Sequence, residues 1–252
     1  SIRGNQWVLA FICDECNYAH VEPLKDKSQA PQALERFAKR IRNMCGAKSD
    51  GYTLGKDLIV GGIHTDNEPV LKGAEWKSAR NQLGITELHS VPYVPQMNGT
   101  CERFVQTIKD ALRTMMSGVD SRVWGWGVEH ACAVFNMKAH KKCAKHNDGI
   151  ICSPNEVLVK VSTNPFLQDQ KEKRKYLRRF GCVAFFKPHE SPQEKEDARN
   201  KVLLPKRKRG SHLGFSLNNS AWRIGTVNEA GRFATYETRD VSFREDVLVR
   251  DI

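Results

Sequence analysis

The pattern of apolar and polar positions changes period several times along the chain, and each change marks an expected element. Residues Trp7 to Cys13 form a continuous apolar run, which predicts a strand covered on both faces. The run ends abruptly at Asp14 and Glu15, and Asn17 then turns the chain. Residues Tyr18 to Leu24 alternate in polarity, as expected of an antiparallel partner strand.

A helix, a strand, a second helix and a short strand are predicted next. Ser28 and Pro31 stand in the order of a cap and a first-turn proline, and Gly46 ends the helix that they begin. Residues Leu58 to Ile63 predict a second buried strand, which runs into the polar sequence His64 to Asn67. The following helix and strand are expected over Gly73 to Leu83 and Ile85 to Val91.

The most strongly patterned stretch begins after Pro95. Asn98-Gly99 is a turn signal, and Thr100 can cap the start of a helix. Apolar residues then recur every three or four positions, which predicts one buried stripe: Cys101, Phe104, Val105, Ile108, Ala111, Leu112 and Met115. The opposite stripe carries Glu102, Gln106, Lys109 and Arg113. A carboxylate in a first turn interacts favourably with the helix dipole, so Glu102 taken alone can be a helix-stabilising residue.

The remaining pattern divides the chain into two parts joined by a linker. A helix over Arg122 to Lys138 and a helical turn at Pro154 to Leu158 complete an α/β order over residues 1–165, which predicts a mixed sheet with flanking helices. Residues 166–180 form a basic linker. Short runs separated by turn residues predict a small all-β module over residues 181–252. Trp222 and Phe233 could stack on bases, but we favour core packing for both.

The charge of the chain favours an anionic partner. Of its 252 residues 40% are hydrophobic, enough for a core, and the formal net charge is +11. Residues Asp169 to Arg209 contain 14 Lys and Arg against 6 Asp and Glu, a net charge of +8. We expect the basic segments Lys171 to Arg179 and Lys206 to Arg209 to bind phosphates; the alternative is a solvated linker. No apolar run approaches the ~20 residues of a membrane helix, so no membrane partner is expected.

The eight cysteines are scattered through predicted strands and helices, which favours reduced, buried thiols of an intracellular protein. Cys13 and Cys16 have CxxC spacing, but no second pair follows at the distance of a zinc ribbon. A second cluster contains ligand types that suit zinc in a spacing that matches no common finger: His140, Cys143, His146 and Cys152. Its lysine-rich setting opposes a dication, so whether it binds a metal stays open.

Three carboxylates carry the candidate chemistry. Asp14 and Asp66 each close a predicted buried strand, and Glu102 opens a predicted helix. If the two strands are neighbours in one sheet, their ends bring the aspartates together, and a helix on that sheet can add Glu102. Three such carboxylates repel one another unless cations neutralise them, and hard oxygen ligands suit Mg²⁺. Two Mg²⁺ or Mn²⁺ ions ~3.5–4 Å apart can clamp the attacking and leaving oxygens of a phosphoryl transfer.

Four ordered motifs resemble the integrases of copia-type retrotransposons. The three carboxylates follow an Asp, Asp, Glu order with 35 residues between Asp66 and Glu102. The sequence Pro95-Gln-Met-Asn-Gly-Thr-Cys-Glu-Arg103 resembles the family's Pro-Gln-x-Asn-Gly-x-x-Glu-Arg signature. The C-terminal part holds further matches to the family: Leu177-Arg-Arg-Phe-Gly-Cys182, Gly210-Ser-His-Leu-Gly-Phe-Ser216 and Arg239-Asp-Val-Ser-Phe243. Together they cover nearly the whole chain.

The resemblance implies a ribonuclease H-like core and an enzyme that trims the 3′ ends of element DNA and joins them to target DNA. It implies that Asp14, Asp66 and Glu102 are catalytic and hold the metal ions. The residues expected to contact DNA are Gln96, Asn98, Arg103, Lys109, Arg113, Lys206, Arg207, Lys208 and Arg209. An ordinary solvated lysine is the alternative for Lys109. Element ends and target DNA are the implied partners, together with further copies of the chain; no small-molecule substrate is expected.

The resemblance also implies a piece of a Pol polyprotein that acts in the nucleus after a cytoplasmic particle stage, with no secretion signal. The chain departs from the family at Asp66-Asn-Glu-Pro69, where Asp-x-Gly-x-Glu-Phe is common. This departure marks an altered site or a divergent branch. Two other functions stay open. One is a nuclease or transposase of the ribonuclease H-like group, and the other is a DNA-binding derivative without catalytic activity.

Overall fold

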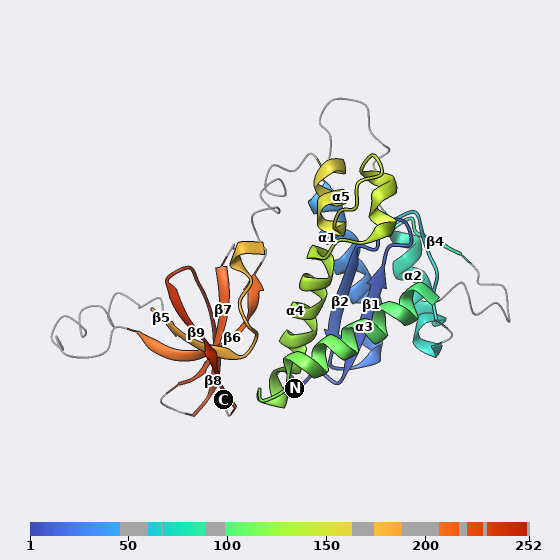
Figure 1. Cartoon of the computed structure of the whole chain (residues 1–252). Helices are drawn as coiled ribbons and strands as arrows, with labels where there is room; N and C mark the ends of the chain where they lie inside the picture. The colour runs from blue at the N-terminus through green and yellow to red at the C-terminus, as the bar shows by residue number, and fades with distance from the viewer. Residues whose placement is uncertain are drawn as a thin grey trace. The chain divides into compact units, whose positions relative to one another are not determined.

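The computed structural model describes residues 1–45, 60–66, 68–88, 99–162, 174–187, 207–216, 221–228 and 231–250. It is a mixed α/β structure that divides into two compact units (Figure 1). The N-terminal unit consists of Arg3–Asp110 and Ala131–Lys175, and the C-terminal unit of Ser1–Ile2, Ala111–His130 and Tyr176–Ile252. Among the helices that are described, none combines the length and apolar composition needed to cross a membrane.

The N-terminal unit opens with the predicted antiparallel pair. Strands β1 (Trp7–Ile12) and β2 (Ala19–Leu24) pair over their full lengths, from Trp7 opposite Leu24 to Ile12 opposite Ala19. Asn17 turns the chain with φ at 57°, a left-handed conformation that asparagine tolerates better than most residues. The apolar run and the alternating run therefore form a hairpin, as the sequence predicted.

The prediction that β1 is covered on both faces is wrong at its start. Trp7 is 45% exposed and Val8 40% exposed, whereas Phe11 is buried. The Lys27 ammonium lies over the Trp7 ring, 4.4 Å from its centroid, and also bonds Glu68 at 2.8 Å. The apolar run alone does not tell which of its residues the helices reach.

Helix α1 (Ala30–Cys45) packs on this hairpin and buries Leu34, Ala38 and Ile41. Its start differs from the prediction, since a short 3₁₀ turn (Lys27–Gln29) precedes it and Asp26 is the cap. The Asp26 carboxylate accepts from the Ser28 N–H at 2.8 Å, and the Gln29 side chain accepts from the Asp26 N–H in return. Ser28, which we expected to cap the helix, therefore lies inside the 3₁₀ turn that precedes it.

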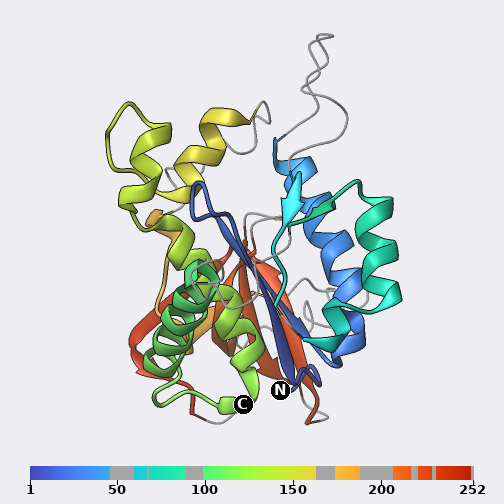
Figure 2. The same cartoon turned by 90° about the vertical axis from the view of Figure 1, so that its right-hand side faces the viewer.

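The second strand region is shorter than predicted within the described residues. Strand β3 comprises Gly62–Ile63 and pairs in parallel with β4 (Thr86–Glu87). A 3₁₀ turn (Pro69–Leu71) and helix α2 (Ala74–Gln82) connect them. Helices α1 and α2 lie side by side (Figure 2), and Trp76 of α2 is buried against α1 and β1 in one core cluster. Leu58 and the residues after Leu88 in the predicted strands lie outside the described part.

Two long helices follow, α3 (Gly99–Met115) and α4 (Trp124–Met137), with a 3₁₀ turn (Ser121–Val123) between them. A 3₁₀ helix (Lys141–His146) follows α4, and helix α5 (Pro154–Val161) is longer than the predicted turn.

The C-terminal unit contains the predicted small β-rich module. Its five antiparallel strands lie in the order β8-β7-β6-β5-β9. They are β5 (Cys182–Phe186), β6 (Lys208–Ser216), β7 (Ala221–Val227), β8 (Phe233–Thr238) and β9 (Val241–Leu248). Residues Ala111–His130, from the end of α3 and the start of α4, group with this sheet. The sequence-derived boundaries at residues 165 and 180 stay a prediction.

Aromatic and apolar packing supports the module from two sides. Trp222 stacks edge-on with Phe243 and donates from its indole to the Tyr176 carbonyl at 2.9 Å. Phe233 packs against Trp126 of α4, with ring centroids 5.5 Å apart. Both residues contribute to packing, as we favoured from the sequence.

A pair of buried histidines joins α4 to the sheet within this unit. His130 and His212 meet edge to face, with ring centroids 5.7 Å apart. The His212 Nδ1 lies 3.1 Å from the Arg179 carbonyl, which can only accept, so Nδ1 donates. Gly214, with φ at +105°, lets the backbone pass the His130 ring, because a Cβ there would lie 3.3 Å from Nδ1. Burial lowers the pKa of His130 to about 3 and of His212 to about 4.

We expect the stability of the chain to fall between pH 7 and pH 5. Both histidines have pKa values well below 6.5 when folded, so the unfolded state binds protons first as the pH falls. Each should cost about 1 kcal/mol of unfolding free energy per pH unit below about 6. Urea denaturation at pH 7 and pH 5 measures this change. The loss of unfolding free energy between pH 7 and pH 5 should be smaller in His212→Asn than in the parent. The control His146→Gln, whose side chain is exposed, should show the same loss as the parent.

Candidate active site

Asp14 lies in the tight turn between β1 and β2. The Cys13 N–H donates to the Tyr18 carbonyl at 2.8 Å, and the Asn17 N–H donates to the Cys13 carbonyl at 3.0 Å. These bonds close the turn and leave the Asp14 side chain exposed. The neighbouring Glu15 is held differently, because Lys145 of the 3₁₀ helix donates to its carboxylate. This hydrogen bond lowers the pKa of Glu15.

Asn136 fixes the base of this turn, and sequence reasoning missed it. Its side-chain oxygen accepts from the Ala19 N–H at 2.9 Å, and its amide nitrogen donates to the Ala19 carbonyl at 2.7 Å. Asn136 is 6% exposed, so both bonds are buried. The start of β2 is thereby joined to α4. The only sequence signal was an amide on the apolar face of a predicted helix.

Glu102 is carried by the first turn of α3. The helix begins at Gly99, one residue before the predicted cap Thr100. Glu102, Gln106, Lys109 and Arg113 are all exposed, as the stripe analysis predicted, and Phe104 and Ile108 are buried. The Phe104 ring meets Phe135 of α4 edge-on, with centroids 4.9 Å apart. Helix α4 therefore anchors both α3 and the hairpin that carries Asp14.

Asp66 follows strand β3 and is exposed. The expectation that the strands before Asp14 and Asp66 pair in one sheet is not met within the described residues, where β1 pairs with β2 and β3 with β4. The two pairs do share a core, since Ile63 and Leu9 pack on one buried cluster. Strand β4 is held by Glu87, whose carboxylate lies 3.1 Å from the Arg80 guanidinium.

Cys101 reports on all three carboxylates. Its pKa is raised first by burial and then by the negative charges of Asp66, Asp14 and Glu102, in that order. The three side chains, which are far apart in the sequence, thus act on one thiol. Within the described residues, no group of three or more His, Cys, Asp and Glu side chains is gathered closely enough to hold a metal ion. Their role as metal ligands stays a prediction.

The CxxC pair beside Asp14 differs in part from the reduced, buried thiols that we expected, because Cys13 is not fully buried. A hydrogen bond from the Cys16 side chain lowers the pKa of Cys13 to about 6. The same bond, followed by burial, raises the pKa of Cys16. Cys13 is partly exposed, whereas Cys16 is buried in the cluster that also contains Cys143 and Cys152. A partly exposed thiol of low pKa was missed, since the sequence shows the spacing but not the hydrogen bond.

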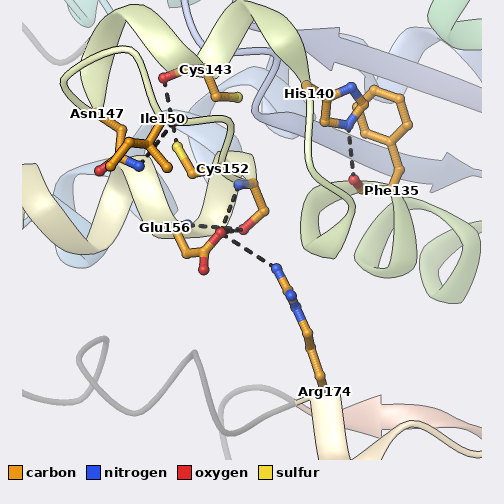
Figure 3. A network of polar contacts seen from close by, with 9 residues as sticks. Phe135, His140, Cys143, Asn147, Ile150, Cys152, Glu156 and Arg174 are labelled. Atoms are coloured by element: carbon orange, nitrogen blue, oxygen red, sulfur yellow. Dashed lines mark hydrogen bonds and ion pairs between the residues drawn. The ribbon is translucent and has the colours of Figure 1, made fainter.

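The residues of the second cluster, His140, Cys143, His146 and Cys152, each contact a different backbone carbonyl of the protein. His140 Nε2 lies 3.2 Å from the Phe135 carbonyl (Figure 3). The Cys143 thiol donates to the Cys16 carbonyl at 3.0 Å. The Cys152 thiol lies 3.6 Å from the Cys143 carbonyl, and His146 Nε2 lies 3.3 Å from the Glu15 carbonyl. These contacts tie the segment 140–152 to the Asp14 turn.

Many of the predicted phosphate-binding cations form ion pairs within the protein. Arg174 lies 3.4 Å from Glu156, which also caps α5 through Ser153 (Figure 3). Arg178 lies 3.7 Å from Glu245, and Arg207 2.7 Å from Asp240. Lys208 and Arg209 are exposed in β6, and Arg103 is exposed on α3. Three predicted DNA contacts, Gln96, Asn98 and Lys206, lie outside the described residues.

Two curated relatives match nearly the whole chain. It is 26% identical over 247 residues to the Retrovirus-related Pol polyprotein from transposon TNT 1-94 of Nicotiana tabacum. It is 25% identical over 248 residues to the Retrovirus-related Pol polyprotein from transposon RE2 of Arabidopsis thaliana. Each match takes in 97% of this chain, which spans 16% and 14% of the two polyproteins. No protein-family model matches the chain. The matches support an origin in a retrotransposon Pol polyprotein. Polyproteins of this kind carry enzymatic domains.

We predict that Asn136→Ala destabilises the chain by about 2 kcal/mol, because the Ala19 N–H and carbonyl stay buried without their partners. Urea denaturation measures the loss. Asn81→Ala, on the exposed side of α2, is the matched control and should change the unfolding free energy by less than about 0.5 kcal/mol. Equal effects of the two substitutions would contradict the role assigned to Asn136.

The Cys101 thiol should become more reactive when a neighbouring carboxylate is neutralised. We expect Asp66→Asn to accelerate its alkylation by iodoacetamide near pH 8, since the lowered pKa increases the thiolate fraction. Asp14→Asn should act in the same direction with a smaller effect. Peptide mass spectrometry separates Cys101 from the other cysteines. Glu15→Gln, a neutralisation beside Asp14, is the control, and an equal acceleration there would contradict the arrangement.

Proposed function

We propose that the chain is the integrase segment of a copia-type Pol polyprotein, which processes the 3′ ends of element DNA and transfers them into target DNA. The observation that carries this proposal is the placement of Glu102. Glu102 lies in the first turn of α3, on the exposed side of the helix and inside the Pro95 to Arg103 motif. The preceding residue is Cys101, whose pKa is raised by burial and by the charges of Asp66, Asp14 and Glu102. A ribonuclease H-like core is the finer fold that the order of strands and helices supports.

The proposed ligands suit Mg²⁺ or Mn²⁺ in their chemistry. Asp14, Asp66 and Glu102 offer only hard oxygen atoms, and all three side chains are exposed to water. The proposal requires them to close around the ions from the positions described above. Bound ions would supply charge neutralisation at the phosphate that reacts.

The chain's own cations have two separate roles in this proposal. Lys109 lies two helical turns after Glu102 on the same exposed stripe, where it would contact element DNA near the reacting phosphate. Lys208 and Arg209 of β6 would bind other phosphates of the DNA. Integration needs two DNA ends at once, so we propose that several copies of the chain act together, in the nucleus.

A transposase or nuclease of the ribonuclease H-like group is the second candidate, since it would use the same three carboxylates. Its product distinguishes it, because a nuclease cuts strands without joining them. A DNA-binding derivative without catalysis is the third, favoured by the absence from the described residues of a gathered ligand group. It would bind DNA tightly and neither cut nor join it.

We expect the chain to join a labelled duplex of element-end sequence to a target duplex when Mg²⁺ or Mn²⁺ is added. Asp66→Asn should lower this activity roughly a hundredfold or more, because a ligand that neutralises the transition state is lost. Gel analysis of the products measures it. Asp148→Asn is the control, since its side chain is 94% exposed and distant in the sequence from the motif. Equal activity of Asp66→Asn and the parent would refute the assignment.

A further inference from the structure

Phe185 is exposed in a strand whose other residues are buried. Cys182, Val183, Ala184 and Phe186 of β5 are at most 3% exposed, whereas Phe185 is 37% exposed. Neighbouring residues of a strand point to opposite faces, so Phe186 enters the core beside Tyr236 and Phe185 points away from it. An isolated exposed apolar side chain is common on protein surfaces, so what matters is the set of groups around it.

Phe185 has a polar partner on each side in the sheet. It stands opposite Arg209 of β6 and opposite Ser242 of β9 in the strand register. Side chains directly opposite one another on adjacent strands point to the same face and lie within contact range. The Arg207 guanidinium donates to the Ser242 hydroxyl at 2.9 Å, which places a second arginine beside this row. We call the row Arg209, Phe185 and Ser242 the Phe185 face.

Some cations of the C-terminal unit form ion pairs within the protein and others do not. Arg178, Arg223 and Arg244 pair with carboxylates of the protein. Within the described part of the chain, Lys187, Lys208 and Arg209 are exposed and form no ion pair. Lys187 comes two positions after Phe185, whereas Lys208 stands opposite Phe186 and therefore belongs to the other face of the sheet. Arg209, which stands opposite Phe185, is therefore an exposed cation that forms no ion pair within the described residues, and it is available to an external anion beside an exposed aromatic ring. Arg232 and Arg250 are likewise exposed without an ion pair in the described part of this unit.

We propose that the Phe185 face binds an unpaired nucleotide of single-stranded DNA. The base stacks on the Phe185 ring, and Arg209 contacts the adjoining phosphate. Stacking on an aromatic side chain combined with phosphate contacts is how proteins bind single strands. A base inside a duplex presents only its edges to a protein, so Phe185 gains a stacking partner only where the strands are separated. This proposal rests on the proposed function in that DNA is the substrate, and it adds a preference for unpaired ends.

The test compares two substitutions of Phe185 in the full chain. Fluorescence anisotropy gives the dissociation constants for a labelled oligothymidylate and for a duplex of equal length. Phe185→Leu keeps an apolar side chain without an aromatic face and should weaken single-strand binding roughly tenfold. Duplex binding should change less than about twofold, because it rests on phosphate contacts. Phe185→Tyr should restore single-strand binding to the parent value.

Arg209→Gln and Val247→Ala complete the test. Arg209→Gln should weaken the binding of both DNAs. It should also reduce the slope of log Kd against log salt concentration by the amount expected for about one phosphate contact. Val247 is an apolar residue of the same sheet with 40% exposure, so Val247→Ala is the matched control and should alter neither constant. The proposal is overturned if Phe185→Leu leaves single-strand binding unchanged, as expected for a surface that docks a protein. It is also overturned if Phe185→Leu weakens both DNAs equally.

The two proposals can fail separately. A chain that loses its preference for single strands in Phe185→Leu but joins no DNA would keep the Phe185 face and refute the integrase assignment. If the parent joins strands and Phe185→Leu leaves single-strand binding unchanged, the integrase assignment is kept and the role of the Phe185 face is refuted.

Discussion

The arrangement of the candidate site depends on the buried side chain of Asn136. Its amide exchanges two hydrogen bonds with the backbone of Ala19, which otherwise would have an unpaired N–H and carbonyl in the interior. Because Phe135, the preceding residue, packs on Phe104, one turn of α4 holds both the hairpin of Asp14 and the helix of Glu102. The two carboxylates are exposed, but the backbones that carry them are fixed to one buried element.

The strongly periodic parts of this fold could be predicted from the sequence. Helix α3 shows a full apolar stripe, and its start was placed within two residues. The hairpin was predicted because an apolar run, a turn residue and an alternating run follow one another. In both cases the signal is local, since a helix or hairpin is specified by residues a few positions apart.

The contacts that place the site could not be predicted, because they join residues that no local pattern links. Asn136 is 117 positions from Ala19, and its partner is backbone, which carries no sequence signal. The pairing of Arg207 with Asp240 spans 33 positions, so a dense basic segment looked more available to phosphates than it is. The low pKa of Cys13 depends on a hydrogen bond to Cys16, whereas the spacing of the two cysteines is equally compatible with inert thiols. The three-carboxylate hypothesis came from motif order and spacing, and it stays a prediction.

The turn between β1 and β2 limits how the chain can vary in length. Cys13 and Tyr18 are bonded across it, so the four residues between them span a closed loop with Asp14 at its start. Inserting a residue here would break that closure or shift β2 by one position against β1, which would turn its buried side chains toward water. Length changes in a related chain should therefore accumulate in other connections, while this one keeps its number of residues.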